Sequence, residues 1–129
     1  MHALWGNIIA NNGKAGVKLT MGKRVSNNIF YHNNFINNTP QVKVYVDVNI
    51  WDDGHPSGGN YWSDYTGTDA NYDGIGDTPY IIDANNTDHY PLMTPYIIPE
   101  FPSFLILPLF FMATLLAVIV HRRKHRQTD

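Results

Sequence analysis

The sequence predicts an all-β protein: the end of a parallel β-helix, or solenoid, closed by a cap and followed by one transmembrane α-helix. Short β-branched and aromatic runs recur between Asn residues over 1–50, which predicts partial β-helix coils. A stretch rich in Asp, Gly and aromatic residues, without helical or strand periodicity, fills 51–96 and predicts the cap. Residues 97–129 contain a linker, an uncharged apolar run at 101–120 and a basic tail.

Length, cysteine content and charge limit the possible functions. The chain has 129 residues, enough for one domain and an appendage. It has no Cys, which excludes disulfides and thiolate metal sites. The formal net charge is −2, but the segment from Val44 to Ile98 carries nine Asp and neither Lys nor Arg. Water, backbone N–H groups or a bound cation must therefore neutralise these carboxylates, and a metal ion is the simplest of these.

Residues 6–48 contain runs of strand length that predict the coils. These runs are Asn7 to Ile9, Gly16 to Leu19, Asn28 to Tyr31, Asn34 to Asn38 and Val42 to Val48. Asn7-Ile8-Ile9 is similar to Asn28-Ile29-Phe30 about 21 residues later, and such a spacing suits one coil of a solenoid. Strands would then stack, with Asn side chains forming ladders at the corners. The alternative is a β-meander with Asn-rich turns.

The stretch from Asp69 to Asp77 predicts a calcium site. It matches the first nine positions of the calcium loop D-x-[DN]-x-[DN]-G, in which oxygen ligands alternate and Gly makes a turn. The predicted ligands are the side chains of Asp69, Asn71, Asp73 and Asp77 and the backbone carbonyl of Ile75. Position twelve is Tyr80 instead of Glu, so the shell would be completed by Asp83, Asp64 or Asp88. The alternative is an irregular turn, in which Asn, Asp and Gly are also common.

Aromatic and acidic side chains alternate in the same region, which is typical of carbohydrate-binding sites. The candidates are Trp51, Tyr61, Trp62, Tyr65, Asp52, Asp53 and Asp64. The alternative, which we favour, is that the rings close the open end of the solenoid, because the Gly58-Gly59 turn would fold them over the last coil. A hydrolase would use Asp52 or Asp53 together with Asp64 as its carboxylate pair.

The chain also resembles a known family. The repeated N-x-I segments, the GNYWSDY and DGIGDTPY stretches and the segment from Ile81 to Pro95 resemble the C-terminal end of archaeal NosD-like surface proteins. This resemblance spans residues 5–96 and implies a right-handed parallel β-helix of the carbohydrate-binding and sugar-hydrolase (CASH) group. It does not imply one activity, because hydrolases, lyases, binding modules and adhesins share this solenoid.

The same resemblance raises a role in copper supply, with which NosD-like proteins are associated. Imidazole and thioether groups are the side chains that bind copper in the absence of Cys. The candidates here are His32, His55, His89, Met21 and Met93. They are scattered along the chain with no ligand spacing, so the residues alone do not predict a copper site.

Two features lead us to expect that the chain is the C-terminal portion of a longer protein. The start, MHALWGNIIANNG, lacks the basic region, apolar core and cleavage site of a signal peptide. The sequence also supplies about two coils where a solenoid needs about three. The first coil is therefore expected to expose an apolar edge that includes Ile8, Ile9 and Val17.

The segment from Phe101 to Val120 predicts a single-pass membrane anchor. It is uncharged and, at about 1.5 Å a residue, long enough to cross a bilayer as a helix. The basic block from His121 to Arg126 predicts an extracellular β-rich part and a cytoplasmic C-terminus, and no nucleic-acid partner. Pro99, Glu100 and Phe101 are similar to the PEF-type sorting signal of archaeosortases, which implies such a partner and a cleaved anchor.

Together these features predict a cell-surface, membrane-anchored β-helix module with a calcium-stiffened cap. It is expected to bind a polysaccharide or surface glycan, or to serve a structural or adhesive role. The alternatives are a surface polysaccharide hydrolase or lyase and a NosD-like copper-maturation protein. Catalysis by this chain itself is not the favoured interpretation.

Overall fold

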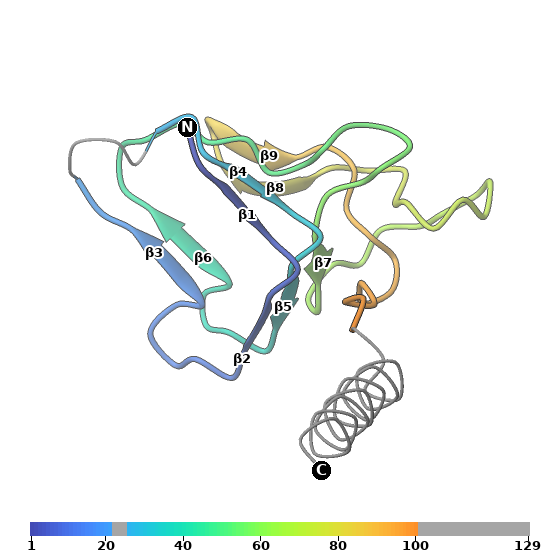
Figure 1. Ribbon diagram of the computed structural model, residues 1–129, viewed down its shortest axis with the longest axis horizontal. Helices are drawn as coiled ribbons and strands as arrows, with labels where there is room; N and C mark the ends of the chain where they lie inside the picture. The colour runs from blue at the N-terminus through green and yellow to red at the C-terminus, as the bar shows by residue number, and fades with distance from the viewer. Residues whose placement is uncertain (22–25, 101–129) are drawn as a thin grey trace, which may run out of the picture. The chain divides into compact units, whose positions relative to one another are not determined.

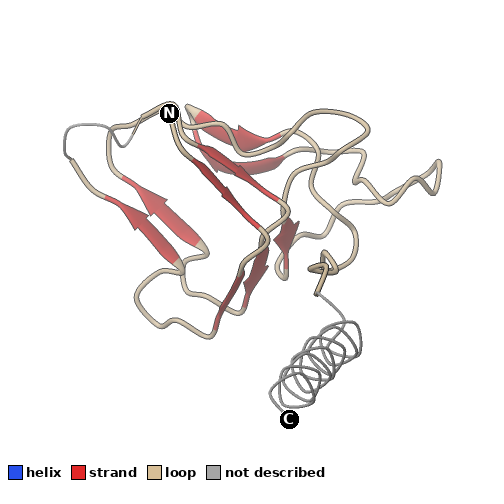
Figure 2. Ribbon diagram, viewed as in Figure 1, coloured by secondary structure: helices blue, strands red, loops and turns tan. Residues whose placement is uncertain are grey.

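The computed structural model describes residues 1–21 and 26–100, and this part of the chain is all-β, as predicted. Loops and turns connect the strands, and the described residues contain no helix (Figure 2). One compact unit spans Met1–Ile98. The strands are β1 (Ala3–Trp5), β2 (Ile8–Ala10), β3 (Val17–Leu19), β4 (Ile29–Tyr31), β5 (Asn34–Ile36), β6 (Val42–Val44), β7 (Tyr61–Trp62), β8 (Tyr80–Asp83) and β9 (Asn86–Asp88).

Most strands pair in the parallel sense, in separate sheets (Figure 1). β1 pairs with β4, β2 pairs with β5, which also pairs with β7, and β3 pairs with β6. Each of the first two passes of the chain thus adds one strand to each of these three sheets. This pairing is consistent with stacked β-helix coils and excludes a β-meander, in which consecutive strands pair antiparallel. Only β8 and β9 form an antiparallel pair among the described strands.

The register between the first two coils differs from the predicted one. Ile8 lies opposite Asn34, so Asn7 stacks on Asn33, 26 residues later, and not on Asn28. The predicted spacing occurs one coil further on, between Asn28 and Asn49, which are 21 residues apart. Ile50 bridges Ile29 of β4 and so begins the third coil. The first coil is longer than the second because more residues connect β3 to β4 than connect β6 to Ile50.

The core consists of stacked aromatic rings. Trp62 lies between Phe35 and Tyr80, with ring centroids 4.3 and 4.2 Å away, and Phe30 stacks on Trp51 at 4.4 Å. Residues in register on parallel strands project to the same face, so each coil adds one layer to the stack. Trp51 and Trp62 are fully buried. The aromatic residues of the 51–96 stretch therefore form part of the core.

The 51–96 stretch is more regular than its sequence predicts. Within it, β7 continues the parallel sheet of β2 and β5, and Leu92 forms a further parallel bridge to Tyr61. Strand β7 has only two residues, which is too short to produce a detectable alternation of polar and apolar side chains. The stack thus continues beyond residue 50.

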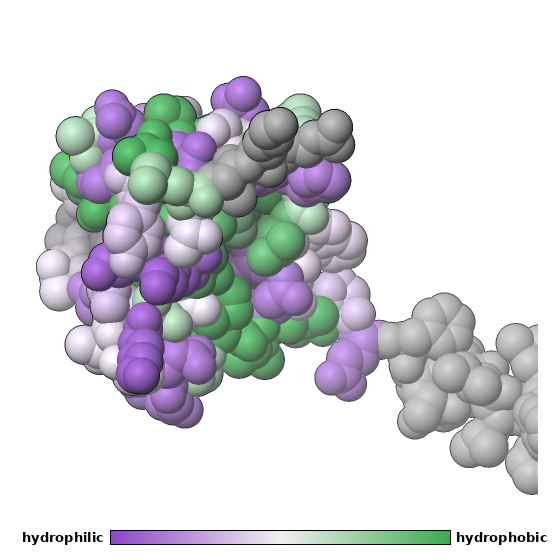
Figure 3. Space-filling view, turned by 90° about the vertical axis from the view of Figure 1, so that its left-hand side faces the viewer, coloured by the Kyte–Doolittle hydropathy of each residue, from purple (hydrophilic) through white to green (hydrophobic). Residues whose placement is uncertain are grey.

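Several predictions fall at or beyond the end of the described residues. The apolar segment 101–120, Phe101 of the sorting motif and the basic tail lie outside them, while Pro99 and Glu100 are exposed. Within the described residues, no helix is long and apolar enough to cross a membrane. Membrane anchoring, its topology and archaeosortase processing stay predictions. Over the face seen in Figure 3, hydrophobic and hydrophilic residues are interspersed.

Candidate functional site

The loop from Asp52 to Gly58 contains three of the candidate site residues, Asp52, Asp53 and His55. Its two ends are fixed, because Trp51 before it and the Gly58-Gly59-Asn60 segment at its end are buried. Within the loop, the N–H of Gly58 donates to the carbonyl of Gly54 at 2.7 Å, and the N–H of Asp53 donates to the carbonyl of Gly58 at 2.9 Å. Asp52 Oδ1 accepts the N–H of Gly54 at 3.1 Å. The core therefore holds this loop in place from both sides.

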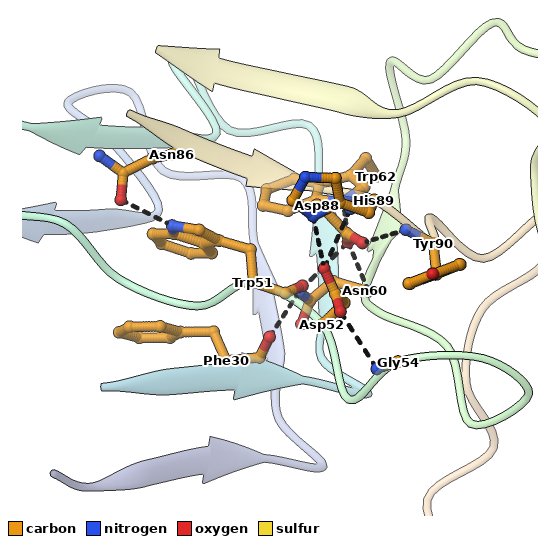
Figure 4. Close-up of polar contacts among 10 residues, drawn as sticks. All are labelled: Phe30, Trp51, Asp52, Gly54, Asn60, Trp62, Asn86, Asp88, His89 and Tyr90. Atoms are coloured by element: carbon orange, nitrogen blue, oxygen red, sulfur yellow. Dashed lines mark hydrogen bonds and ion pairs between the residues drawn. The ribbon is translucent and has the colours of Figure 1, made fainter. Parts of the chain in front are cut away.

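His89 forms a paired contact with this loop (Figure 4). Asp52 Oδ2 accepts the backbone N–H of His89 and lies 3.1 Å from its Nδ1. The Asp52 side chain is 12% exposed and that of His89 is 63% exposed, so the carboxylate is sheltered while the ring faces solvent. A carboxylate at Nδ1 holds the proton there and leaves the Nε2 lone pair free. His89 is thereby prepared to act as a ligand or base through Nε2.

The other two candidate histidines contact the same loop. His55 belongs to it, and its Nε2 lies 3.4 Å from Asp73 Oδ2. His32 Nε2 lies 2.8 Å from the carbonyl of Ser57, and its ring stacks on Tyr96 at 4.2 Å. These histidines are far apart in the sequence, which is why their spacing indicated no site. The fold brings them to one loop.

Tyr90 lies beside the loop, and the backbone of Met93 lies beside the segment that holds the partner of His55. The ring of Tyr90 lies 6.2 Å from that of His55 and 6.4 Å from that of His89. Met93 donates its backbone N–H to the carbonyl of Gly74 at 3.0 Å, next to Asp73, the partner of His55. The donors are of the kind that copper prefers. In residues 1–21 and 26–100, however, no three His, Asp or Glu side chains converge closely enough to hold a metal ion.

The Asp69 to Asp77 loop is held by its own backbone. Asp69 accepts the N–H groups of Asp73 at 3.2 Å and Gly74 at 2.9 Å, and Asp77 accepts that of Ala70 at 2.9 Å. Asp73 Oδ1 accepts the N–H of Ile75 at 2.9 Å, which lowers the pKa of the Asp73 carboxyl. Backbone N–H groups thus neutralise part of the charge that was ascribed to a cation. Calcium binding by this loop stays a prediction.

The three carboxylates suggested to complete the calcium shell are engaged elsewhere. Asp64 accepts the hydroxyl of Tyr80 and the side-chain amide of Gln41, each at 3.1 Å. Asp83 accepts the amide of Asn86 at 3.0 Å, and Asp88 is completely buried. Each carboxylate terminates a chain of hydrogen bonds from the coils, and its part in a calcium shell stays a prediction.

The carbohydrate-binding candidates are divided between the core and the surface. Trp51 and Trp62 are buried, so their rings are not available to stack on a sugar. Tyr65 donates its hydroxyl to the carbonyl of Thr78 at 2.6 Å, and Asp53 accepts the hydroxyl of Ser57 at 2.7 Å. Tyr61 is half-buried in β7. The structure does not bring these residues together as one aromatic platform.

Asp88 is a buried carboxylate beneath the candidate site (Figure 4). Its Oδ2 accepts the backbone N–H of Asn60 at 2.7 Å and the indole N–H of Trp62 at 2.9 Å, and its Oδ1 accepts the N–H of Tyr90 at 3.0 Å. Burial raises the pKa of Asp88 to about 6, although these N–H bonds act in the opposite direction. The carboxyl is ionised at neutral pH and joins β9 to the core.

We expect Asp88 to make the protein less stable as the pH rises from 4 to 6. Its pKa is about 6 in the folded protein and 3.8 ordinarily, so the folded state binds more protons between these values. The stabilisation that Asp88 provides is complete below pH 3.8 and is lost as the pH rises through about 6. The free energy of unfolding should fall by about 3 kcal/mol across this range. Urea unfolding across this range should show the slope, and Asp88→Asn should remove it. An unchanged slope in the variant would contradict the assignment.

Comparison with known proteins identifies the family. Residues 2–67 match the family described as "Periplasmic copper-binding protein (NosD)". The chain belongs to the NosD family. The matched region includes the first coils with His32 and the loop with His55, whereas His89 lies beyond it.

Two curated NosD relatives are similar over part of the chain. The "Probable ABC transporter binding protein NosD" of Stutzerimonas stutzeri is 41% identical over 78 residues, which cover 57% of this chain and 17% of the relative. The protein of the same name from Pseudomonas aeruginosa is 41% identical over 75 residues, 58% of this chain and 17% of the relative. The chain thus spans a small part of the length of these NosD proteins. No solved structure matches it significantly. The predicted archaeal origin and PEF signal stay predictions.

Proposed function

We propose that this chain is a copper-binding β-helix module that holds copper at the loop from Asp52 to Gly58. Membership of a family described as periplasmic and copper-binding supports the choice of metal and a location outside the cytoplasm. The parallel strand pairs support the β-helix, and right-handed coils are the usual form of parallel crossover connections.

The observation that carries the proposal is the pairing of Asp52 with His89. A carboxylate that fixes the Nδ1 proton of an imidazole orients the ring and strengthens Nε2 as a metal ligand. His55, 56% exposed on the same loop, supplies a second imidazole, and Met93, which carries a thioether, bonds through its backbone to Gly74, next to His55's partner Asp73. Because no three of the described His, Asp and Glu side chains converge, we expect the ion to be held by few protein ligands and to exchange readily.

Copper titration of single variants tests this proposal. We expect His89→Ala and His55→Ala each to weaken copper binding by about tenfold or more, and Asp52→Asn to do the same although Asp52 is not a ligand. Met21→Leu removes an exposed thioether on the first coil and should leave the affinity unchanged. Isothermal titration calorimetry of untagged protein measures each dissociation constant. Equal affinities for the wild type and both histidine variants would contradict the site.

A glycan-binding role has less support from the structure. Both tryptophans that would provide the largest sugar-stacking surfaces are in the core. The copper proposal requires no change in the core, because its ligands already face solvent. We therefore retain copper binding as the single proposed function.

A further inference from the structure

Ladders of hydrogen-bonded side chains run through the stack, and all of them point the same way. In the first ladder, the backbone N–H and side-chain amide of Asn7 both donate to Asn33 Oδ1, at 3.2 and 2.9 Å. Asn33 donates in the same two ways to Asn60 Oδ1, at 3.1 and 3.0 Å. Asn60 then donates to Asp88 Oδ2, at 2.7 and 3.4 Å. Donors thus face the C-terminal end of the stack, and acceptors face the N-terminal end.

The second ladder has the same polarity. Asn12 donates its N–H and its amide to Asn38 Oδ1, at 3.0 and 2.9 Å. Asn38 donates to Gln41 Oε1, and the Gln41 amide donates to Asp64 Oδ1 at 3.1 Å. This ladder also ends on a carboxylate.

The third ladder repeats the pattern along another corner. Asn28 donates its N–H and amide to Asn49 Oδ1, at 3.0 and 3.2 Å, and the N–H of Asn49 donates to Asn86 Oδ1 at 2.9 Å. The Asn86 amide then donates to Asp83. Its first acceptor, Asn28 Oδ1, receives the N–H of His2 at 3.0 Å.

The two ends of the stack therefore differ in chemistry. At the C-terminal end each ladder stops at a carboxylate, which has no N–H to pass on. At the N-terminal end, Asn7 and Asn12 use their amide donors inside the stack, and within the described residues no donor reaches their Oδ1 atoms. These two oxygens are acceptors that face out of the first coil.

The N-terminal face also exposes the last apolar layer of the core. Leu4 lies in register with Phe30, and Ile9 lies in register with Phe35, so both project to the core face. Leu4 is 42% exposed, although its partner Phe30 is buried. Each of β1, β2 and β3 has a pairing partner on one side only among the described strands. Backbone groups, an apolar layer and two amide acceptors therefore face the same way.

A second copy of the chain does not complement this face. Two N-terminal faces placed together would bring the Oδ1 acceptors of Asn7 and Asn12 against like acceptors. The C-terminal end of another copy offers no donor there either, because its ladders stop at the carboxylates of Asp64 and Asp83 and at Asp88, which is buried. A complementary partner must therefore present N–H donors opposite the Oδ1 atoms of Asn7 and Asn12.

We propose that the N-terminal face docks a further parallel β-coil that carries side-chain amides in register with Asn7 and Asn12. Such a coil donates two N–H groups to each Oδ1, pairs with β1 to β3 and covers Leu4 and Ile9. The ladder polarity makes docking one-way, so the C-terminal end of the stack does not accept the same coil. The curated relatives are several times longer than the matched segment, so NosD proteins contain enough chain to supply such a coil. This inference is independent of copper binding.

The chain's own second coil provides the probe. A copy of residues 28–48 inserted between Met1 and His2 of the full chain would place its Asn33 over Asn7 and its Asn38 over Asn12, in the observed register. We expect the inserted coil to raise the thermal midpoint by about 5 °C or more. Hydrogen exchange of the β1, β2 and β3 amides should slow at the same time. An unchanged midpoint with unchanged exchange would overturn the proposal.

Two matched variants test the polarity. In the inserted copy, Asn33→Asp and Asn38→Asp replace donors by acceptors of the same shape, so the gain in midpoint should be lost. Equal stabilisation by the Asp-bearing copy would overturn the role of the ladders. Sedimentation of the unmodified chain should show a monomer. A dimer that is lost in Asn7→Asp would identify a second copy as the partner and overturn the proposal.

Discussion

Asn33→Asp is expected to lower the free energy of unfolding by about 3 to 5 kcal/mol. The Asn33 side chain is completely buried, and its amide lies 3.0, 3.1 and 3.0 Å from the carbonyls of Leu4 and Tyr31 and from Asn60 Oδ1. The substitution preserves the shape of the side chain but replaces the donor by a negatively charged acceptor. Three acceptors would then face an unpaired buried charge.

Urea unfolding at neutral pH measures this loss. Asn37→Asp is the matched control, because Asn37 is exposed and should tolerate the change with a loss below about 0.5 kcal/mol. At low pH the introduced carboxyl becomes protonated and regains a donor, so the loss should shrink. A loss below about 1 kcal/mol at neutral pH would contradict the importance of the ladder at this position.

Gly59→Ala is expected to destabilise the protein by about 3 kcal/mol or more. A Cβ at position 59 would overlap the Asp88 carboxylate. Neither group can move away easily. Gly59 donates its N–H to Tyr90 and accepts that of His32, both at 2.7 Å, and Asp88 is held by N–H donors from the core.

Thermal and urea unfolding of four variants, Gly59→Ala, Asp88→Ala, their combination and Gly13→Ala, separate this overlap from other effects. Gly13→Ala is the control, because a Cβ there meets nothing within 4 Å and the backbone is not left-handed. Gly59→Ala combined with Asp88→Ala lacks the overlapping group, so the double variant should lose less stability than the sum of the two single losses. Strict additivity would show that the overlap is not the cause.

Sequence patterns predicted the strands better than the pairing between them. The runs around Ile8, Val17, Ile29, Phe35 and Val42 all form strands, because β-branched and aromatic residues bounded by Asn, Gly and Pro favour short extended segments. The register was mispredicted because Asn recurs at many positions and several alignments look alike. The lengths of the connecting loops decide between them, and those lengths carry no repeat.

The candidate site likewise depends partly on the sequence and partly on the tertiary structure. The sequence by itself determined which chemistry is available: no thiolate, many carboxylates without nearby Lys or Arg, and a few imidazole and thioether groups. Only the tertiary structure decided which of them meet. It placed Asp52 against His89, 37 residues away, and brought His32 to the loop that contains His55. It also buried Asp88, Trp51 and Trp62. The physical reason is that coil stacking joins residues one or more turns apart, and side-chain contacts between turns leave no local pattern in the chain.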